Sequence, residues 1–100
     1  MEEIFENHIL CKVVNTDVHC GGYKVDDFII VKRRQFTDDN DKYTEFCRIR
    51  RHCGVHEYLS IYKSELKIVN NDKELREFLD IVEGSSSTLE KITRYTVMYK

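Results

Sequence analysis

Proline and tryptophan are absent from this chain of 100 residues, and only four glycines and two methionines are present. Without proline, folding includes no slow isomerisation of an X-Pro bond. No apolar run approaches the roughly 18 residues that a membrane-spanning helix needs. The first six residues, Met-Glu-Glu-Ile-Phe-Glu, are acidic where a secretory signal peptide is basic. We therefore expect a cytoplasmic protein that does not enter a membrane.

Catalytic signatures are also lacking. Gly21-Gly22 indicates a turn and does not form the glycine-rich loop that cradles a phosphate. Cys53 has His52 and His56 nearby, but nothing in the sequence identifies the orienting group that a cysteine nucleophile needs. The acidic run at residues 38–41 lacks the glycine and the distal glutamate of a calcium-binding loop. We therefore expect no enzymatic activity and no cofactor.

The composition is that of a folded domain. Hydrophobic residues make up 41% and charged residues 34%, which argues against disorder. One hundred residues suffice for one modest core, so we expect a single α+β domain over residues 1–100. Four cysteines in a chain without an evident signal peptide are expected to be free thiols.

The clearest local signal is a helix beginning after Asn71. Asn71 is a suitable N-cap, and Glu74 completes a capping box three residues later. The apolar residues that follow recur at helical spacing and predict one buried face: Leu75, Phe78, Leu79 and Val82. Gly84 is expected to end the helix in the left-handed conformation.

Before this helix the chain reads as strands. Ile9–Val14, the long stretch 23–36, 43–53 and 58–62 are rich in strand-forming residues, and a change of alternation predicts a turn or bulge near 63–65. After the helix, Ser87 and Glu90 form a second capping-box pattern. The predicted fold is a mostly antiparallel sheet of about five strands (residues 9–69) packed against one or two helices (72–83 and 88–97).

Charge is distributed unevenly along the chain. Residues 1–31 contain six acidic and two basic side chains, whereas residues 32–52 contain seven basic and four acidic ones. The basic segment reads as a β-hairpin over residues 28–51, and its register decides which face is exposed. If Arg33 lies opposite Cys47, aromatic and cationic side chains share the outer face. Those side chains are Phe28, Lys32, Arg34, Phe36, Phe46, Arg48 and Arg50. Such a face suits single-stranded nucleic acid.

A register shifted by one residue gives a different core face. Arg34 then lies opposite Glu45, and the basic residues only solvate the outer face. The buried set becomes Phe28, Ile30, Phe36, Tyr43, Cys47 and Ile49. The order of strands followed by a helix is similar to that of whirly-type single-stranded-DNA-binding modules, with no shared motif.

A zinc site is a further hypothesis. Cys53 and His56 have the two-residue gap of a zinc knuckle, and His19 and Cys20 precede a glycine turn. These four residues would bind zinc if the two loops met. Buried thiols and surface histidines account for the same residues without a metal.

The main hypothesis is a small non-enzymatic binding module that acts on another protein as an adaptor, inhibitor or subunit. Tyrosine and arginine dominate protein interfaces, so the candidate contact residues are those of the uncovered hairpin face and nearby strands. They are Lys32, Arg34, Tyr43, Phe46, Arg48, Arg50, Tyr58 and Tyr62. A single-stranded nucleic-acid-binding protein is the alternative, and a zinc-binding module the second alternative. A homodimer formed through an edge strand such as 58–62 is also compatible with the sequence.

Overall fold

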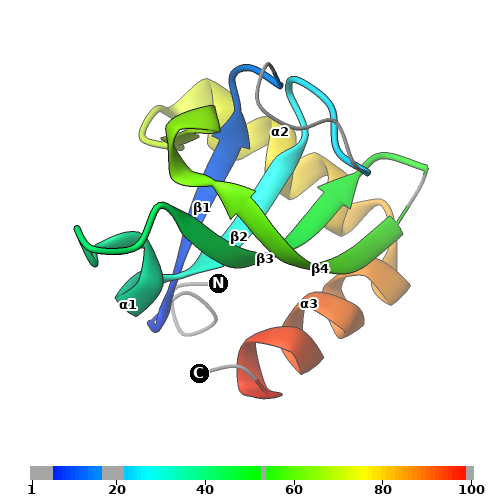
Figure 1. Ribbon diagram of the computed structural model, residues 1–100. Helices are drawn as coiled ribbons and strands as arrows, with labels where there is room; N and C mark the ends of the chain where they lie inside the picture. The colour runs from blue at the N-terminus through cyan, green and yellow to red at the C-terminus, as the bar shows by residue number, and fades with distance from the viewer. Residues whose placement is uncertain (1–5, 17–21, 53, 99–100) are drawn as a thin grey trace.

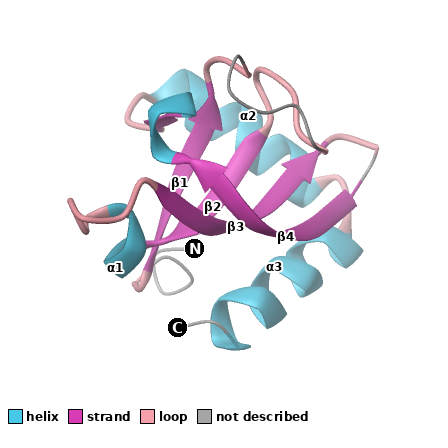
Figure 2. Ribbon diagram, in the orientation of Figure 1, coloured by secondary structure: helices cyan, strands magenta, loops and turns pink. Residues whose placement is uncertain are grey.

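The computed structural model describes residues 6–16, 22–52 and 54–98, except for the side chains of Tyr58 and Leu59. The strands are β1 (His8–Val13), β2 (Phe28–Lys32), β3 (Tyr43–Arg50), β4 (Gly54–Tyr62) and β5 (Leu66–Ile68). The helices are α1 (Arg33–Phe36), the 3₁₀ helix η2 (Lys63–Glu65), α2 (Asp72–Glu83) and α3 (Ser86–Met98). Figure 2 shows the strands and helices, and the colours of Figure 1 show that the two longer helices follow the strands along the chain. The predicted α+β fold is therefore confirmed.

The sheet is antiparallel, in the order β4-β3-β2-β1-β5. In a flat sheet the two edge strands would lie about 19 Å apart, four spacings of about 4.8 Å. Only η2 joins β4 to β5, and the four residue steps from Tyr62 to Leu66 span at most about 14 Å. The sheet must therefore curl until its edges approach each other, and Figure 1 shows this curvature.

Both faces of the curled sheet are buried along β1, β2 and most of β3, whereas His56, Glu57 and Ser60 of β4 are exposed. The concave face is filled by Ile9, Cys11, Val13, Tyr23, Ile29, Val31, Phe46, Ile61 and Leu66, with Phe36 of α1 packed against them. The convex face carries Leu10, Phe28, Ile30, Cys47 and Ile49, which pack against Phe78 and Val82 of α2 and Ile92 and Tyr95 of α3. Figure 1 shows α2 and α3 on the same side of the sheet. The expectation of an uncovered sheet face is wrong for β2 and most of β3, because the curled sheet encloses its own second core.

The pairing of β2 with β3 decides between the two predicted registers. Phe28 lies opposite Ile49 and Ile30 opposite Cys47. The core face of the shifted register is thus confirmed for these four residues, and the first register is wrong. The observed pairing still differs from the shifted register by two residues. Glu45 therefore forms its ion pair with Lys32, not Arg34, and the Lys32 Nζ lies 2.8 Å from Glu45 Oε2.

The long extended segment predicted at 23–36 is interrupted at both ends. Residues before Phe28 form a turn in which Asp26 has φ 75°, and residues 33–36 form the short helix α1. Arg33 anchors this helix because its guanidinium donates to the carbonyl of His8 at 3.1 Å. Phe36 therefore leaves the strand, and Tyr43 remains 42% exposed at the start of β3.

Helix α2 follows its sequence signals closely at its start. Asn71 is the N-cap, and the Glu74 N–H donates to Asn71 Oδ1 at 2.8 Å. The Glu74 carboxylate accepts from the Asn71 side chain and pairs with Lys12 and Lys67. Burial alone would raise the pKa of Glu74, but the hydrogen bonds from Lys67 and Asn71 outweigh it and lower that pKa. The cap also ties the helix to β1 and β5.

The ends of the two helices differ from prediction. Gly84 ends α2 with φ −77°, so the left-handed conformation expected there is wrong. Ser85 then starts the next helix, because its Oγ accepts from the Thr88 N–H at 3.3 Å. Helix α3 thus begins two residues earlier than predicted and continues to Met98. The turn predicted near residues 63–65 is confirmed as η2.

Candidate functional site

Two of the predicted contact residues lie inside the molecule. Phe46 is fully buried on the concave face, where its ring packs edge-on against Tyr23. Arg48 is 6% exposed, and its guanidinium donates to the Gly22 carbonyl at 2.8 Å. The exposure expected of both residues is therefore wrong, because the strand alternation that turns Cys47 and Ile49 toward the helices turns Phe46 and Arg48 to the concave side.

The remaining predicted contact residues do not share one open surface. Tyr43 and Tyr62 pair at the start of β3, where the two hydroxyls are 2.8 Å apart. Arg50 lies at the other end of β3, about 23 Å away along the strand, and holds Asp27 through two hydrogen bonds of 2.7 and 2.6 Å. Lys32 pairs with Glu45, and Arg34 is exposed on α1. The side chain of Tyr58 lies outside the described part of the structure.

The hypothetical zinc ligands are largely outside the described residues as well. His19, Cys20 and Cys53 belong to segments that the structure does not describe, and His56 is exposed on β4. Within residues 6–16, 22–52 and 54–98, no group of three or more His, Cys, Asp or Glu side chains is arranged to hold a metal ion. The zinc site stays a prediction.

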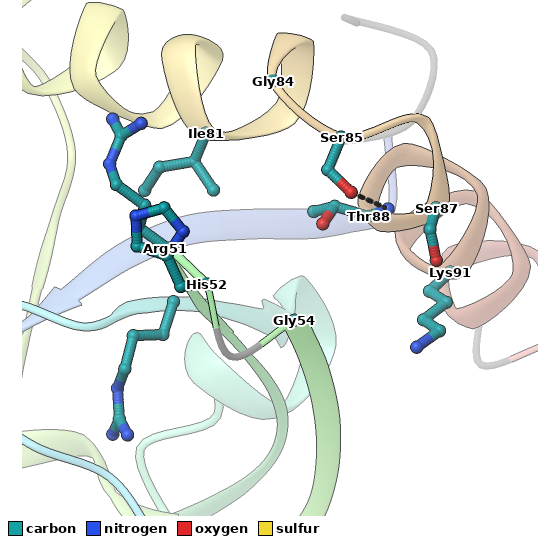
Figure 3. A pocket seen from close by; sticks show the side chains of 10 residues that line it. Arg51, His52, Gly54, Ile81, Gly84, Ser85, Ser87, Thr88 and Lys91 are labelled. Carbon is teal, nitrogen blue, oxygen red and sulfur yellow. Dashed lines mark hydrogen bonds between the residues drawn. The ribbon is translucent and has the colours of Figure 1, made fainter.

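A hollow of about 440 Å³ lies where the end of the β3–β4 hairpin meets the junction of α2 and α3. We call it the basic cleft. It is lined by Arg50, Arg51, His52, Gly54, Ile81, Gly84, Ser85, Ser87, Thr88 and Lys91. Figure 3 shows Arg51 and His52 on the hairpin side and Ser87, Thr88 and Lys91 on the α3 side. Ser87 and Lys91 are four residues apart in one helix and therefore lie on the same helical face.

Charge in the basic cleft has one sign. None of the described residues that line it is acidic. Arg50 is neutralised by Asp27, but Arg51, His52 and Lys91 form no ion pair with any described residue. Elsewhere five described basic side chains have acidic partners: Lys12, Lys32, Lys67, Arg76 and Arg94. The basic cleft thus brings together cations without a described ion pair from two segments about 40 residues apart in sequence.

The backbone presents His52 to this cleft in an unusual conformation. His52 has φ 68°, in the left-handed region that is unfavourable for residues with a Cβ. Gly54, two residues on, has φ 77°. A histidine at such a position costs stability that glycine would not, which is a feature commonly found at functional sites.

The basic cleft opens into a second hollow along α2. This adjoining groove, of about 530 Å³, shares Arg50, Arg51 and Ile81 with the cleft and extends to Lys12 and Glu77. The Lys12 ammonium forms ion pairs there, with Nζ at 3.3 Å from Glu77 Oε2 and 3.4 Å from Glu74 Oε2. The groove extends the hollow along α2, but Lys12, the cation it adds, is already paired.

Sequence reasoning missed this site for an identifiable reason. Arg51 was part of the basic segment 32–52, but no local pattern connects it to Lys91. The capping-box pattern at Ser87 did signal a helix start there, which places Ser87 and Lys91 on one face. Only the packing of α3 beside the hairpin brings that face to Arg51 and His52.

Fold and site together define a small α+β protein with a curled five-stranded sheet, two C-terminal helices and a basic cleft at their junction. No protein-family model, curated protein or solved structure matches the chain. Among the described residues, no helix has both the length and the apolar character needed to cross a membrane.

Proposed function

We propose that this protein is a small non-enzymatic binding module that captures an acidic segment of another protein in the basic cleft. The observation that carries the proposal is that Arg51, His52 and Lys91 line one hollow with no acidic residue among its described lining. Uncompensated charge of one sign attracts a partner of the opposite sign and selects against like-charged partners.

The predicted nucleic-acid alternative has less support. Phe46, the ring expected to stack on bases, is buried in the concave core. Single-strand binding depends on exposed aromatic rings beside the cations, and none of the described residues lining the cleft is Phe or Tyr. An acidic polypeptide needs only the cations and hydrogen-bond donors that are present.

The test compares two double variants with the same net charge. Arg51→Glu/Lys91→Glu reverses the cleft, whereas Arg34→Glu/Lys73→Glu reverses two exposed cations outside it. Fluorescence anisotropy measures the affinity of a short labelled peptide rich in Asp and Glu. We expect the cleft variant to weaken binding by about tenfold or more and the control by less than about threefold, because the control changes only the long-range field.

Equal weakening by the two variants, or unchanged binding by the cleft variant, would refute the cleft as the contact site. A labelled oligodeoxythymidine serves as the competing ligand. Tighter, cleft-dependent binding of that oligonucleotide would favour the nucleic-acid alternative.

A further inference from the structure

We infer that the group recognised at the centre of the basic cleft is a phosphate monoester carried on a serine or threonine of the partner segment. This inference rests on the proposed function and specifies the chemical class of its ligand. It follows from the number, charge and placement of the donors.

The charges match a dianion better than a single carboxylate. Arg51 and Lys91 together bring two positive charges to the cleft, and neither is offset by a described acidic residue. A phosphomonoester carries about −1.5 to −2 at neutral pH, whereas an Asp or Glu carboxylate carries −1. One carboxylate would therefore leave a surplus positive charge in the hollow.

The cleft also contains more hydrogen-bond donors than the two oxygens of one carboxylate can accept in good geometry. Arg51 presents a planar fork of N–H groups, Lys91 an ammonium, and Ser87 a hydroxyl four residues before Lys91 on α3. Arg51 belongs to the hairpin and Ser87 and Lys91 to α3, so the donors lie on opposite sides of the hollow (Figure 3). A tetrahedral phosphate directs three oxygens in different directions, so it can accept from the hairpin side and the α3 side together. A planar carboxylate has two oxygens on one side.

The space suits a side chain with its flanking residues. The cleft has a volume of about 440 Å³, whereas one water molecule occupies about 30 Å³ in the liquid. A phosphate group fills only part of this volume. The adjoining groove past Ile81 gives the chain on one side of the phosphorylated residue a place to lie.

A protein-borne phosphate is favoured over the phosphate of a nucleic acid. The described residues lining the cleft include no Phe or Tyr on which a base could stack. Beyond Arg51, the described lining of the adjoining groove has no unpaired cation to hold the next phosphates of a nucleic-acid backbone, because Lys12 pairs with Glu77 and Arg50 with Asp27. A single phosphate on a polypeptide avoids both difficulties.

Three labelled peptides test the inference. They share one neutral sequence and carry phosphoserine, glutamate or serine at the central position. By fluorescence anisotropy at constant ionic strength, we expect the phosphoserine peptide to bind about tenfold tighter than the glutamate peptide, and the serine peptide to bind weakest.

Variants then assign the preference to the cleft. Arg51→Lys keeps the charge but removes the guanidinium fork, and we expect it to lose most of the phosphoserine preference. Lys91→Gln should reduce the preference as well, whereas Lys73→Gln, on the exposed face of α2, should leave it intact. Circular dichroism checks that each variant is folded.

Equal affinity of wild type for the phosphoserine and glutamate peptides overturns the inference, as does a preference that survives both Arg51→Lys and Lys91→Gln. Tighter cleft binding of a short oligonucleotide than of the phosphoserine peptide also overturns it. If wild type binds the phosphoserine and glutamate peptides equally, the Asp- and Glu-rich peptide can still bind in a cleft-dependent way. The proposed function then stands, although the phosphate is not the recognised group. Loss of that binding as well refutes both.

Discussion

At the scale of single residues, neighbours of the same type have opposite roles. Arg48, Arg50 and Arg51 are within four positions of one another in sequence. Arg48 is buried and holds Gly22, Arg50 holds Asp27, and Arg51 faces the basic cleft without an acidic partner among the described residues. The first two stabilise the segment before β2, whereas Arg51 is the residue that we propose binds the partner segment. Strand alternation and the end of β3 decide these roles.

His52 gives the residue-scale prediction. We expect His52→Gly to raise the free energy of unfolding by about 0.5–1 kcal/mol, because glycine adopts a positive φ without a steric penalty. Urea denaturation followed by circular dichroism measures this change. The same variant should bind the phosphoserine peptide more weakly than wild type, since it loses a side chain that lines the cleft.

Gly54→Ala is the matched comparison. An added Cβ meets no atom within 4 Å, so its only cost is the φ of +77°. We expect this variant to lose about 1 kcal/mol of stability. A destabilised His52→Gly variant would contradict the view that His52 is strained and kept for its side chain.

At the scale of elements, α2 shows what a helical pattern can and cannot specify. The apolar spacing and the Asn71 cap predicted a helix that is present from Asp72 to Glu83. The same spacing placed Leu75 and Phe78 on one buried face, yet Leu75 is 41% exposed and Phe78 is fully buried. Glu74 is buried instead, beside Lys12 and Lys67. Periodicity identifies a face, but the sheet beneath determines how much of that face is covered.

Paired alanine substitutions measure this difference. We expect Phe78→Ala to cost about 3–5 kcal/mol, because it leaves a cavity against Phe28 in the convex core. Leu75→Ala should change stability by less than about 1 kcal/mol, since much of its side chain already contacts solvent. Chemical denaturation curves provide both values. Similar losses for the two variants would show that the exposed edge of α2 contributes as much as its buried centre.

At the scale of the whole molecule, the strand register places Cys11 and Cys47 on opposite faces of the curled sheet. Both are buried free thiols, and burial raises the pKa of each to about 12. In a Cys20→Ser/Cys53→Ser background, we expect neither to react with an aromatic disulfide reagent at mildly alkaline pH. Both should become labelled at the same rate as denaturant is added, because only global unfolding opens both cores. Faster labelling of one cysteine would show that its face opens separately.

The predicted homodimer also belongs to this scale. Strand β4 lies at an edge of the sheet, so the location assumed for edge pairing is correct. Whether two copies pair there stays a prediction.

The sequence by itself determined the local elements of this protein. Capping residues and apolar spacing depend only on neighbours a few positions away, so they located α2, the strand segments, the turn near residue 64 and the α+β class. The register of β2 and β3, the burial of Phe46 and Arg48, and the cleft that joins Arg51 to Lys91 were decided by the tertiary structure. The register, the buried residues and the cleft all follow from how the strands pair and curl and from where α3 packs. Those arrangements are set by contacts between residues far apart in the chain.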